Sequence, residues 1–231
     1  MIHQAKRLVI AIDGPVGAGK STAARRLATA LGYVYIDTGA MYRALGWKAV
    51  RDGVALRDRE RLAELAARTD IRIQPSVAGP RVLVDGEDVT DRLRTPGMDE
   101  ASSLVSVWPE VRERLVALQR AMAGAGGVVM DGRDIGTVVL PDADLKFYLD
   151  ADPDVRAARR QQELERTGVV ADLAAVRTEV LRRDARDSSR ATSPLRPAPD
   201  ALRVDSSRLD ADAVLALMLQ EAAKRSRTDN S

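Results

Sequence analysis

The feature that most constrains the fold is a glycine-rich turn at residues 9–24, which read VIAIDGPVGAGKSTAA. Gly14, Gly19, Lys20 and Ser21 satisfy the spacing G-x-x-x-x-G-K-[ST], and an apolar run precedes them. Because glycine lacks a Cβ, such a turn can adopt positive φ and direct several backbone N–H groups at one anion. The sequence therefore predicts a phosphate-binding loop between a strand and a helix.

The residues after the turn supply charge and a hydroxyl. The helix is predicted to run from Ser21 to a stop at Gly32, with its positive N-terminus facing the anion. Lys20 is placed to neutralise the β- and γ-phosphates, and the Ser21 hydroxyl to ligate Mg²⁺. The alternative is an ordinary glycine-rich turn with one solvated lysine. The agreement of strand, spacing, lysine and hydroxyl favours the phosphate loop.

Composition removes several classes of enzyme and partner. The chain has 231 residues, no cysteine and a single histidine, His3, so catalysis by a thiol or an imidazole is not expected. Its 36 basic and 34 acidic residues give a net charge of +2. Such a small positive charge does not indicate binding to nucleic acid. No apolar run reaches the length of a membrane span and no signal peptide is evident, so we expect a cytoplasmic protein.

Apolar runs alternate with longer helix-like stretches along the chain. Runs typical of strands occupy residues 8–13, 33–37, 127–131, 145–150 and 202–205. This alternation predicts an α/β fold with a parallel sheet covered by helices on both faces. Several of the runs end in aspartate, and the carboxyl ends of parallel strands form the ligand crevice. We therefore expect residues 14–21, 37–43 and 131–134 to gather at one site.

A different pattern interrupts this rhythm at residues 71–94, where apolar and polar residues alternate. Turns at residues 78–80 and 85–86 would connect short strands there. The segment is therefore predicted to be a small antiparallel β insert. It is either a surface decoration or, if polar groups on its flanks point at the crevice, a substrate-binding lobe.

Residues 152–190 are rich in charge and helical in pattern, with an interruption near residues 167–168. Arg156, Arg159 and Arg160 lie within about one helical turn of each other. Such a cluster is usually a solvated face, but beside a triphosphate it could belong to a closing lid. The last long stretch, residues 210–224, is typical of an amphipathic packing helix.

A phosphate loop alone is compatible with a GTPase switch, a mechanical ATPase or a small-molecule kinase. Asn230 is the only asparagine, so the N-K-x-D signature by which GTPases usually read guanine is absent. Mechanical ATPases usually need longer assemblies, whereas this short chain carries a second set of arginines. These arginines indicate a second anionic ligand, which favours a kinase.

Two segments place arginines beside predicted strand ends. In DTGAMYR, Thr38 is placed to cap a helix that carries Arg43 one to two turns later. In DGRD, Arg133 and Asp134 follow an apolar run and are expected to project into the crevice.

A third segment, RRDARDSSR, has helical spacing that brings Arg183, Asp187 and Arg190 near one face. Arg183 and Asp187 could instead be an exposed ion pair worth about 0.3–0.5 kcal/mol. Taken alone, the exposed pair is the simpler interpretation. With Arg43 and Arg133 in the same chain, we interpret the segment as part of an anion site.

The combination of these segments resembles the bacterial cytidylate kinase family, whose members phosphorylate CMP, over essentially the whole chain. The resemblance rests on IDGPVGAGKST, DTGAMYR, GEDVTDRLR, EASSLVSVWPEVRERL, MDGRDIGTVVLPDADLKFYLDA and RRDARDSSRATSPL. It implies the P-loop nucleoside monophosphate kinase fold as a single domain over residues 1–231, with a CMP-binding insert at residues 68–105 and a short helical lid at residues 152–170. Thr38 stands where some relatives have serine, and Ser21 where some have glycine; neither change removes the required chemistry.

The resemblance also implies roles for individual residues. ATP would be bound by Gly14, Pro15, Val16, Gly17, Ala18, Gly19, Lys20, Ser21 and Thr22, with Ser21 as a ligand of Mg²⁺. The CMP phosphate would be bound by Arg43, Arg133 and Arg190 with Thr38 nearby, the cytosine by Ser103, Arg112 and Asp134, and the pentose by Arg183 and Asp187. The catalytic groups would be Lys20, Arg133, Asp134, Arg159 and Arg160. From the residues alone, Ser103 could be an ordinary polar residue at an insert boundary, and Arg112 could pair with a neighbouring glutamate.

The implied reaction is phosphoryl transfer from MgATP to CMP or dCMP in pyrimidine nucleotide metabolism, by a monomer without nucleic-acid or membrane partners. Because the acceptor phosphate is already anionic near neutral pH, no histidine base is needed. Two alternatives stay open: a kinase for another monophosphate or small metabolite, and a nucleotide-binding switch that only changes shape. A panel of acceptors separates the three.

Overall fold

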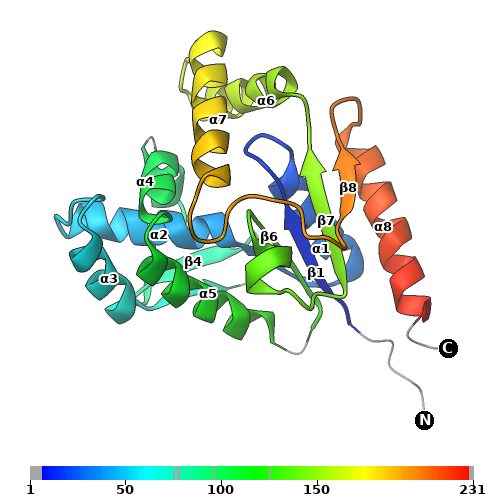
Figure 1. Ribbon diagram of the computed structural model, residues 1–231, viewed down its shortest axis with the longest axis horizontal. Helices are drawn as coiled ribbons and strands as arrows, with labels where there is room; N and C mark the ends of the chain where they lie inside the picture. The colour runs from blue at the N-terminus through cyan, green and yellow to red at the C-terminus, as the bar shows by residue number, and fades with distance from the viewer. Residues whose placement is uncertain (1–6, 75, 77–78, 96, 125, 229–231) are drawn as a thin grey trace. The chain divides into compact units, whose positions relative to one another are not determined.

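The computed structural model describes residues 7–74, 76, 79–95, 97–124 and 126–228 (Figure 1). Its contacts divide the chain into two compact units, Met1–Tyr33 with Ala125–Ser231, and Val34–Gly124. The predicted lid at residues 152–170 lies within the first unit, and the predicted insert at residues 68–105 lies within the second. Each unit has its own hydrophobic packing and is described separately below.

The parallel strands of the first unit have the order β6-β1-β7-β8. They are β1 (Val9–Asp13), β6 (Val128–Gly132), β7 (Leu145–Asp150) and β8 (Leu202–Asp205), while β2 (Val34–Asp37) belongs to the second unit. In the first unit, β1 is central and pairs in parallel with β6 on one side and β7 on the other. Ile10, Ala11 and Ile12 are fully buried, as expected for a strand covered on both faces. The strand predictions are confirmed, since each observed strand begins and ends within one residue of its predicted bounds.

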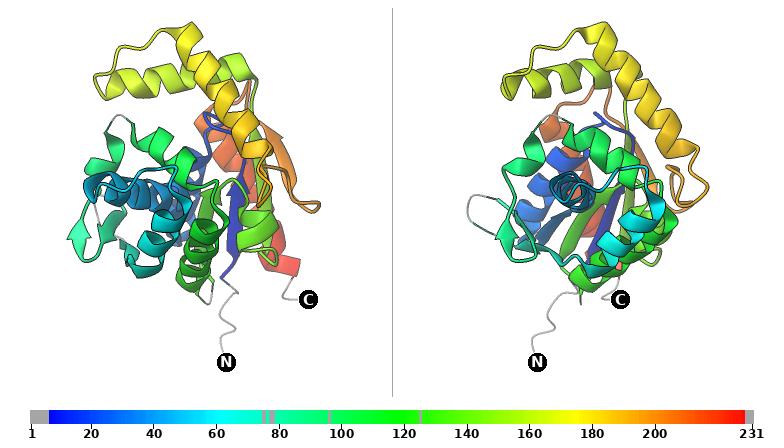
Figure 2. Two further views of the ribbon diagram at one scale, coloured as in Figure 1. Left: turned by 60° about the vertical axis from the view of Figure 1, so that its left-hand side comes forward. Right: turned by 90° about the vertical axis from the view of Figure 1, so that its left-hand side faces the viewer.

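Helices follow the strands of the first unit. They are α1 (Lys20–Leu31), η2 (Ile135–Val139, one π-helical turn), α6 (Pro153–Arg166), α7 (Leu173–Ser188) and α8 (Ala211–Thr228). The helix α1 ends as predicted at Gly32, which has a φ of 65° and a left-handed C-cap conformation. The helices α6 and α7 pack side by side beyond the carboxyl end of β7 (Figures 1 and 2). Val214 and Met218 are buried along α8, which confirms the predicted packing helix.

The second unit combines helices with a small antiparallel sheet. Its elements after β2 are α2 (Thr38–Arg51), α3 (Arg59–Arg68), β3 (Ile71–Gln74), β4 (Arg81–Val84), β5 (Glu87–Asp88), η1 (Arg92–Arg94, a 3₁₀ turn), α4 (Met98–Val105) and α5 (Pro109–Ala123). The sheet order β3-β4-β5 confirms the predicted antiparallel insert. The predicted turn at residues 85–86 is also confirmed, because Asp85 and Gly86 have φ values of 51° and 85°. The other predicted turn includes Ala78, which lies outside the described residues.

The helix α2 runs through the core of the second unit and packs against α4. Met41 and Leu45 are fully buried, and Gly46 allows close approach, since a Cβ there would lie 2.9 Å from the Cβ of Ala101. The prediction that Thr38 caps α2 is wrong. Asp37 is the N-cap, and its Oδ1 accepts the N–H of Ala40 at 2.9 Å, because the helical conformation already begins at Thr38.

Within the described parts of both units, no helix has the length and apolar character needed to cross a bilayer.

Candidate active site

The glycine-rich turn between β1 and α1 has the backbone of an anion-binding loop. Gly14, Gly17 and Gly19 have φ values of 148°, 75° and 89°, which is the geometry that lets successive N–H groups converge. A Cβ on Gly14 would lie 1.9 Å from the carbonyl oxygen of Leu149, and one on Gly17 would lie 2.7 Å from that of Arg156. Only glycine therefore fits where β7 and α6 back the loop, and the N-terminus of α1 adds its positive dipole.

Lys20 is the first residue of α1 and is only 5% exposed. Its Nζ donates to the carbonyl oxygen of Pro15 at 2.5 Å. Burial lowers the pKa of Lys20 to about 7, and the positive charges of Arg133 and Arg183 act in the same direction. A nearby phosphate would favour the charged form of this amine. An anionic ligand in the loop would therefore stabilise the positive charge of Lys20.

Ser21 and Asp131 bring two oxygen donors together beside the loop. Ser21 Oγ donates to Asp131 Oδ2 at 2.9 Å, and Asp131, near the end of β6, is 3% exposed. Hydroxyl and carboxylate oxygens suit Mg²⁺, which usually completes its coordination with phosphates and water. No group of three or more His, Cys, Asp or Glu side chains suited to a metal occurs in the described part of the chain. Ser21 and Asp131 supply two such oxygens, which fits a Mg²⁺ ion held mainly by phosphate oxygens and water.

Asp187 lies between two arginines at the end of α7. Its Oδ2 accepts from Arg133 Nε at 2.9 Å, and its Oδ1 accepts from Arg190 Nη2. Burial raises the pKa of Asp187, but the charges of Arg133, Arg190 and Arg183 outweigh that effect and hold the pKa below its usual value. Asp187 is 1% exposed, so the alternative of an exposed Arg183–Asp187 pair is wrong. Arg190 lies beyond the helix, which ends at Ser188.

Asp13, which the sequence analysis did not single out, joins the phosphate loop to the segment after β6. Its carboxylate accepts the N–H of Ile135 and of Gly136, each at 2.7 Å. Burial raises the pKa of Asp13 to about 7. These bonds fix the backbone that follows Arg133 and Asp134 against the strand that leads into the loop. The sequence feature that could have pointed to Asp13 is its place immediately before Gly14, the first glycine of the loop.

In the second unit, Arg43 lies near the start of α2 with a carboxylate on either side. Its Nη2 donates to Asp37 Oδ2 at 2.7 Å, and its Nη1 lies 3.6 Å from Asp99 Oδ1. Burial lowers the pKa of Arg43, but Asp37 and Asp99 outweigh that effect and raise the pKa above its usual value. The guanidinium stays fully charged with its side chain 23% exposed, and is thus accessible to an anion.

Ser103 on α4 and Arg112 on α5 are both buried, at 3% exposure each. Ser106 brings them together, because its hydroxyl donates to the carbonyl oxygen of Ser103 at 3.0 Å and its own carbonyl accepts from Arg112 Nη1 at 3.3 Å. The Arg112 guanidinium also lies 5.5 Å from the ring centroid of Tyr42. Arg112 is therefore a buried cation held by a backbone carbonyl and an aromatic ring, not a solvated one.

Comparison with known proteins decides the family. Residues 10–224 match the protein family described as Cytidylate kinase. The chain belongs to the cytidylate kinase family. Curated relatives named cytidylate kinase are 53% identical in Pelotomaculum thermopropionicum, covering 91% of this chain and 93% of the relative, and 52% identical in Desulfitobacterium hafniense, covering 91% and 90%. A third, from Geobacillus kaustophilus, is 50% identical and covers 95% of this chain and 98% of the relative.

For this member of the cytidylate kinase family, the arginines of α6 have distinct surroundings. Arg156 is 5% exposed and donates to the carbonyl oxygen of Val16 at 3.1 Å and to Asp184 Oδ2 at 2.5 Å, so it braces the phosphate loop. Arg159 donates to the hydroxyl and carbonyl oxygens of Ser206 at 2.9 and 2.7 Å. Arg160 pairs with Glu163 at 2.7 Å. The solvated-face interpretation does not describe Arg156, which is an internal support.

The predicted site residues of this cytidylate kinase family member fall in both units. The first unit holds the loop residues 14–22 with Arg133, Asp134, Arg159, Arg160, Arg183, Asp187 and Arg190, and the second holds Thr38, Arg43, Ser103 and Arg112. Within the first unit, Arg133, Asp187 and Arg190 are in direct contact. Asp37 and Asp131 were not predicted as site residues and only begin the predicted segments 37–43 and 131–134. Each nevertheless contacts a predicted site residue, Arg43 and Ser21 respectively.

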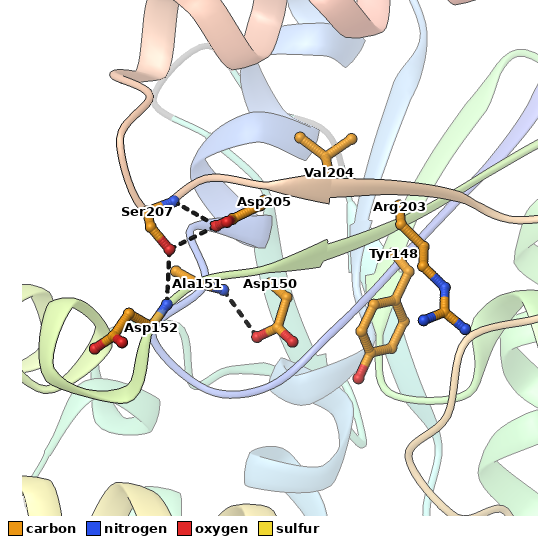
Figure 3. A pocket seen from close by; sticks show the side chains of 8 residues that line it. All are labelled: Tyr148, Asp150, Ala151, Asp152, Arg203, Val204, Asp205 and Ser207. Carbon is orange, nitrogen blue, oxygen red and sulfur yellow. Dashed lines mark hydrogen bonds between the residues drawn. The ribbon is translucent and has the colours of Figure 1, made fainter.

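A separate cavity of about 440 Å³ lies at the carboxyl ends of β7 and β8 (Figure 3). It is lined by Tyr148, Asp150, Ala151, Asp152, Arg203, Val204, Asp205 and Ser207. Ser207 Oγ donates to Asp205 Oδ1 at 2.5 Å and accepts the N–H of Asp152 at 2.8 Å. Three carboxylates and one guanidinium, that of Arg203, line this cavity, so its charge suits a phosphate less well than the glycine-rich loop does.

Proposed function

We infer that this protein transfers the γ-phosphoryl group of ATP to CMP or dCMP, giving ADP and CDP or dCDP, in pyrimidine nucleotide metabolism. The observation that carries this conclusion is the cytidylate kinase match over residues 10–224, which includes an intact phosphate loop with Lys20. The protein is therefore an ATP-dependent nucleoside monophosphate kinase.

The reaction forms a bond between an oxygen of the acceptor phosphate and the γ-phosphorus, and it breaks the bond from that phosphorus to the β,γ-bridging oxygen. The acceptor oxygen is already ionised near neutral pH, so the protein needs alignment and charge neutralisation rather than a general base. Lys20 and the loop N–H groups would bind the donor phosphates and stabilise charge in the transition state. Mg²⁺, held by Ser21 with Asp131 beside it, would supply further charge neutralisation.

We propose that three groups of residues bind the three parts of the acceptor nucleotide. Arg43, Arg133 and Arg190 bind its phosphate with Thr38 nearby, Ser103, Arg112 and Asp134 read the cytosine, and Arg183 and Asp187 contact the pentose. The burial of Ser103, Arg112 and Asp134, which are each at most 4% exposed, supports a recognition role, since buried polar groups need specific partners.

The α6 arginines are proposed to act on the donor side. Arg159 and Arg160 would stabilise the transferring group once α6 and its neighbour close over ATP, which would also exclude water and suppress hydrolysis. Closure would require Arg159 to exchange its bonds to Ser206 for bonds to phosphate. Arg156 supports the loop and is not assigned to the chemistry.

We further propose that the enzyme works as a cytoplasmic monomer with no nucleic-acid or membrane partner. Size-exclusion chromatography with light scattering checks the oligomeric state, and a mass near twice that of the chain would contradict it.

An acceptor panel tests the function directly. The protein is incubated with MgATP and CMP, dCMP, UMP, AMP or GMP, with EDTA as a control for metal dependence, and ADP formation is measured. Turnover with CMP and dCMP supports the proposal. Turnover with a different acceptor selects another small-molecule kinase, and ATP binding without acceptor-dependent turnover selects a nucleotide switch.

A further inference from the structure

Asp37 makes two contacts with its two carboxylate oxygens. Oδ1 accepts the N–H of Ala40 at 2.9 Å, which caps α2, and Oδ2 accepts from Arg43 Nη2 at 2.7 Å. One side chain thus fixes both the first turn of the helix and the guanidinium that lies over that turn. Helix capping alone needs only one of these oxygens.

The guanidinium of Arg43 needs a negatively charged partner because of its place on the helix. Side chains on a helix lean towards its N-terminus, and there the positive end of the helix dipole repels a cation. Asp37 compensates this repulsion, and Asp99 adds a second negative charge 3.6 Å from Nη1. A phosphate approaching the same turn would be attracted both by the dipole and by the held guanidinium.

Gly39 provides the space for this pair. A Cβ at position 39 would lie 3.1 Å from Asp37 Oδ1 and 3.3 Å from Arg43 Nη1, which is tighter than ordinary van der Waals contact. Alanine is the better helix former, so helix stability does not explain a glycine in the first turn. The glycine leaves room for the guanidinium and the carboxylate beside the first turn of the helix.

We propose that Asp37 is a positioning residue that holds the Arg43 guanidinium in the orientation in which it binds the acceptor phosphate. This inference rests on the proposed function, because it takes Arg43 to bind the phosphate of CMP. Asp37 itself would not touch the substrate. Its carboxylate fixes one edge of the guanidinium, and the remaining N–H donors of the fork are presented to the phosphate.

Asp37→Ser separates the two roles of Asp37. Serine is a good N-cap residue, but it is too short to reach the guanidinium, so helix capping is kept and the ion pair is lost. Asp58→Ser is the matched control, because Asp58 caps α3 through the N–H of Arg61 and makes no ion pair in the described part of the chain. Asp37→Asn, which keeps the size and the cap, is the second variant in case Asp37→Ser fails to fold.

Steady-state kinetics with CMP and ATP are measured for wild type, Asp37→Ser, Asp58→Ser, Arg43→Ala and the Asp37→Ser/Arg43→Ala double variant. We expect Asp37→Ser to raise KM for CMP about tenfold, the size of effect when a charge-assisted hydrogen bond is lost. KM for ATP should stay unchanged, and kcat should change by less than about threefold, because the interaction orients a binding group rather than the transferring phosphoryl. In the Arg43→Ala background, the same substitution should change KM for CMP by less than about twofold, because the group it positions is gone.

The outcomes distinguish the inference from the function on which it rests. If wild type does not phosphorylate CMP, the proposed function fails. If wild type is active and Arg43→Ala leaves KM for CMP unchanged, the phosphate assignment is wrong and the inference falls with it. If Arg43→Ala weakens CMP but Asp37→Ser has no effect, lowers KM, or raises KM equally in both backgrounds, Asp37 does not act through Arg43. An Asp58→Ser effect as large as that of Asp37→Ser would assign the change to helix capping and overturn the inference.

Discussion

Each arginine proposed to bind the acceptor phosphate has a carboxylate partner in its own unit. Arg43 bonds to Asp37 at 2.7 Å, Arg133 bonds to Asp187 at 2.9 Å, and Arg190 also bonds to Asp187. A guanidinium removed from water is costly unless it is paired, so these carboxylates keep the cations in place. Because a guanidinium has five N–H donors, pairing one edge leaves others for a phosphate.

Lys20→Ala tests the donor site at this scale. The lysine is buried and its pKa is lowered to about 7 by burial, so its removal deletes a group that is costly to bury. We expect the variant to fold with stability equal to or above that of wild type, and kcat to fall by about 10²–10³, as when one transition-state donor is removed. Phosphoryl transfer is measured at equal folded fraction from circular dichroism. Activity within a few-fold of wild type would contradict the donor assignment.

Asp187→Asn tests the buried ion pairs. Two arginines would lose their shared counter-charge, and breaking a buried pair from one side costs about 3–5 kcal/mol. Because the partners Arg133 and Arg190 keep some access to water, at 18% and 6% exposure of their side chains, we expect the lower end, about 3 kcal/mol, in urea unfolding near pH 7.

The same variant predicts a pH dependence. Asp187 has a lowered pKa in the folded state because three arginines outweigh its burial. Its stabilisation is therefore complete above the ordinary pKa of about 3.9 and is lost as the pH falls below that value towards the folded pKa. The difference in unfolding free energy between wild type and Asp187→Asn should shrink on acidification below about pH 4. A difference that stays constant down to acid unfolding would contradict the ion-pair account.

At the scale of the element, the sequence predicted strands and helices well and their junctions less well. Buried parallel strands are continuous apolar runs, so β1 and β6, which begin VIAI and VVM, could be predicted directly from the sequence. The cap of α2 and the end of α7 depend on which side chain reaches which N–H or cation. The sequence spacing could not distinguish Asp37 from Thr38 as the cap, because both side chains can accept a backbone N–H. It also could not show that α7 ends at Ser188, before Arg190.

The crossing of α2 and α4 gives a prediction for packing. Gly46→Ala would place a Cβ 2.9 Å from the Cβ of Ala101, so the two helices would have to separate. We expect destabilisation of about 1–3 kcal/mol from overpacking, although alanine is about 1 kcal/mol better than glycine within a helix. Adding Ala101→Gly should restore part of this loss in urea unfolding. If Gly46→Ala were itself more stable than wild type, the contact would not limit the crossing.

At the scale of the whole molecule, the order of the segments along the chain was enough to predict the fold class. The pairing of charges was not predictable in the same way. Asp13 contacts residues 135 and 136, and Asp187 contacts Arg133, across more than 50 residues in each case. Such contacts depend on tertiary structure, whereas helical spacing had suggested the local partner Arg183 for Asp187. The sequence could therefore nominate candidate site residues, but not the contacts between them.

Base selectivity tests how the proposed roles are divided over the chain. Cytosine presents an amine where uracil presents a carbonyl, so UMP would place an acceptor against the Asp134 carboxylate in a buried site, at about 1–3 kcal/mol. We expect wild type to prefer CMP over UMP by at least about tenfold in kcat/KM, the ratio that 1.4 kcal/mol gives. Asp134→Ala should lower activity with CMP and shrink that preference. Arg43→Ala should weaken CMP and UMP about equally, because it addresses only their shared phosphate. If steady-state kinetics showed the Asp134→Ala enzyme keeping its full preference while the Arg43→Ala enzyme lost it, the separation of base readers from phosphate-binding arginines would be wrong, even for an active kinase.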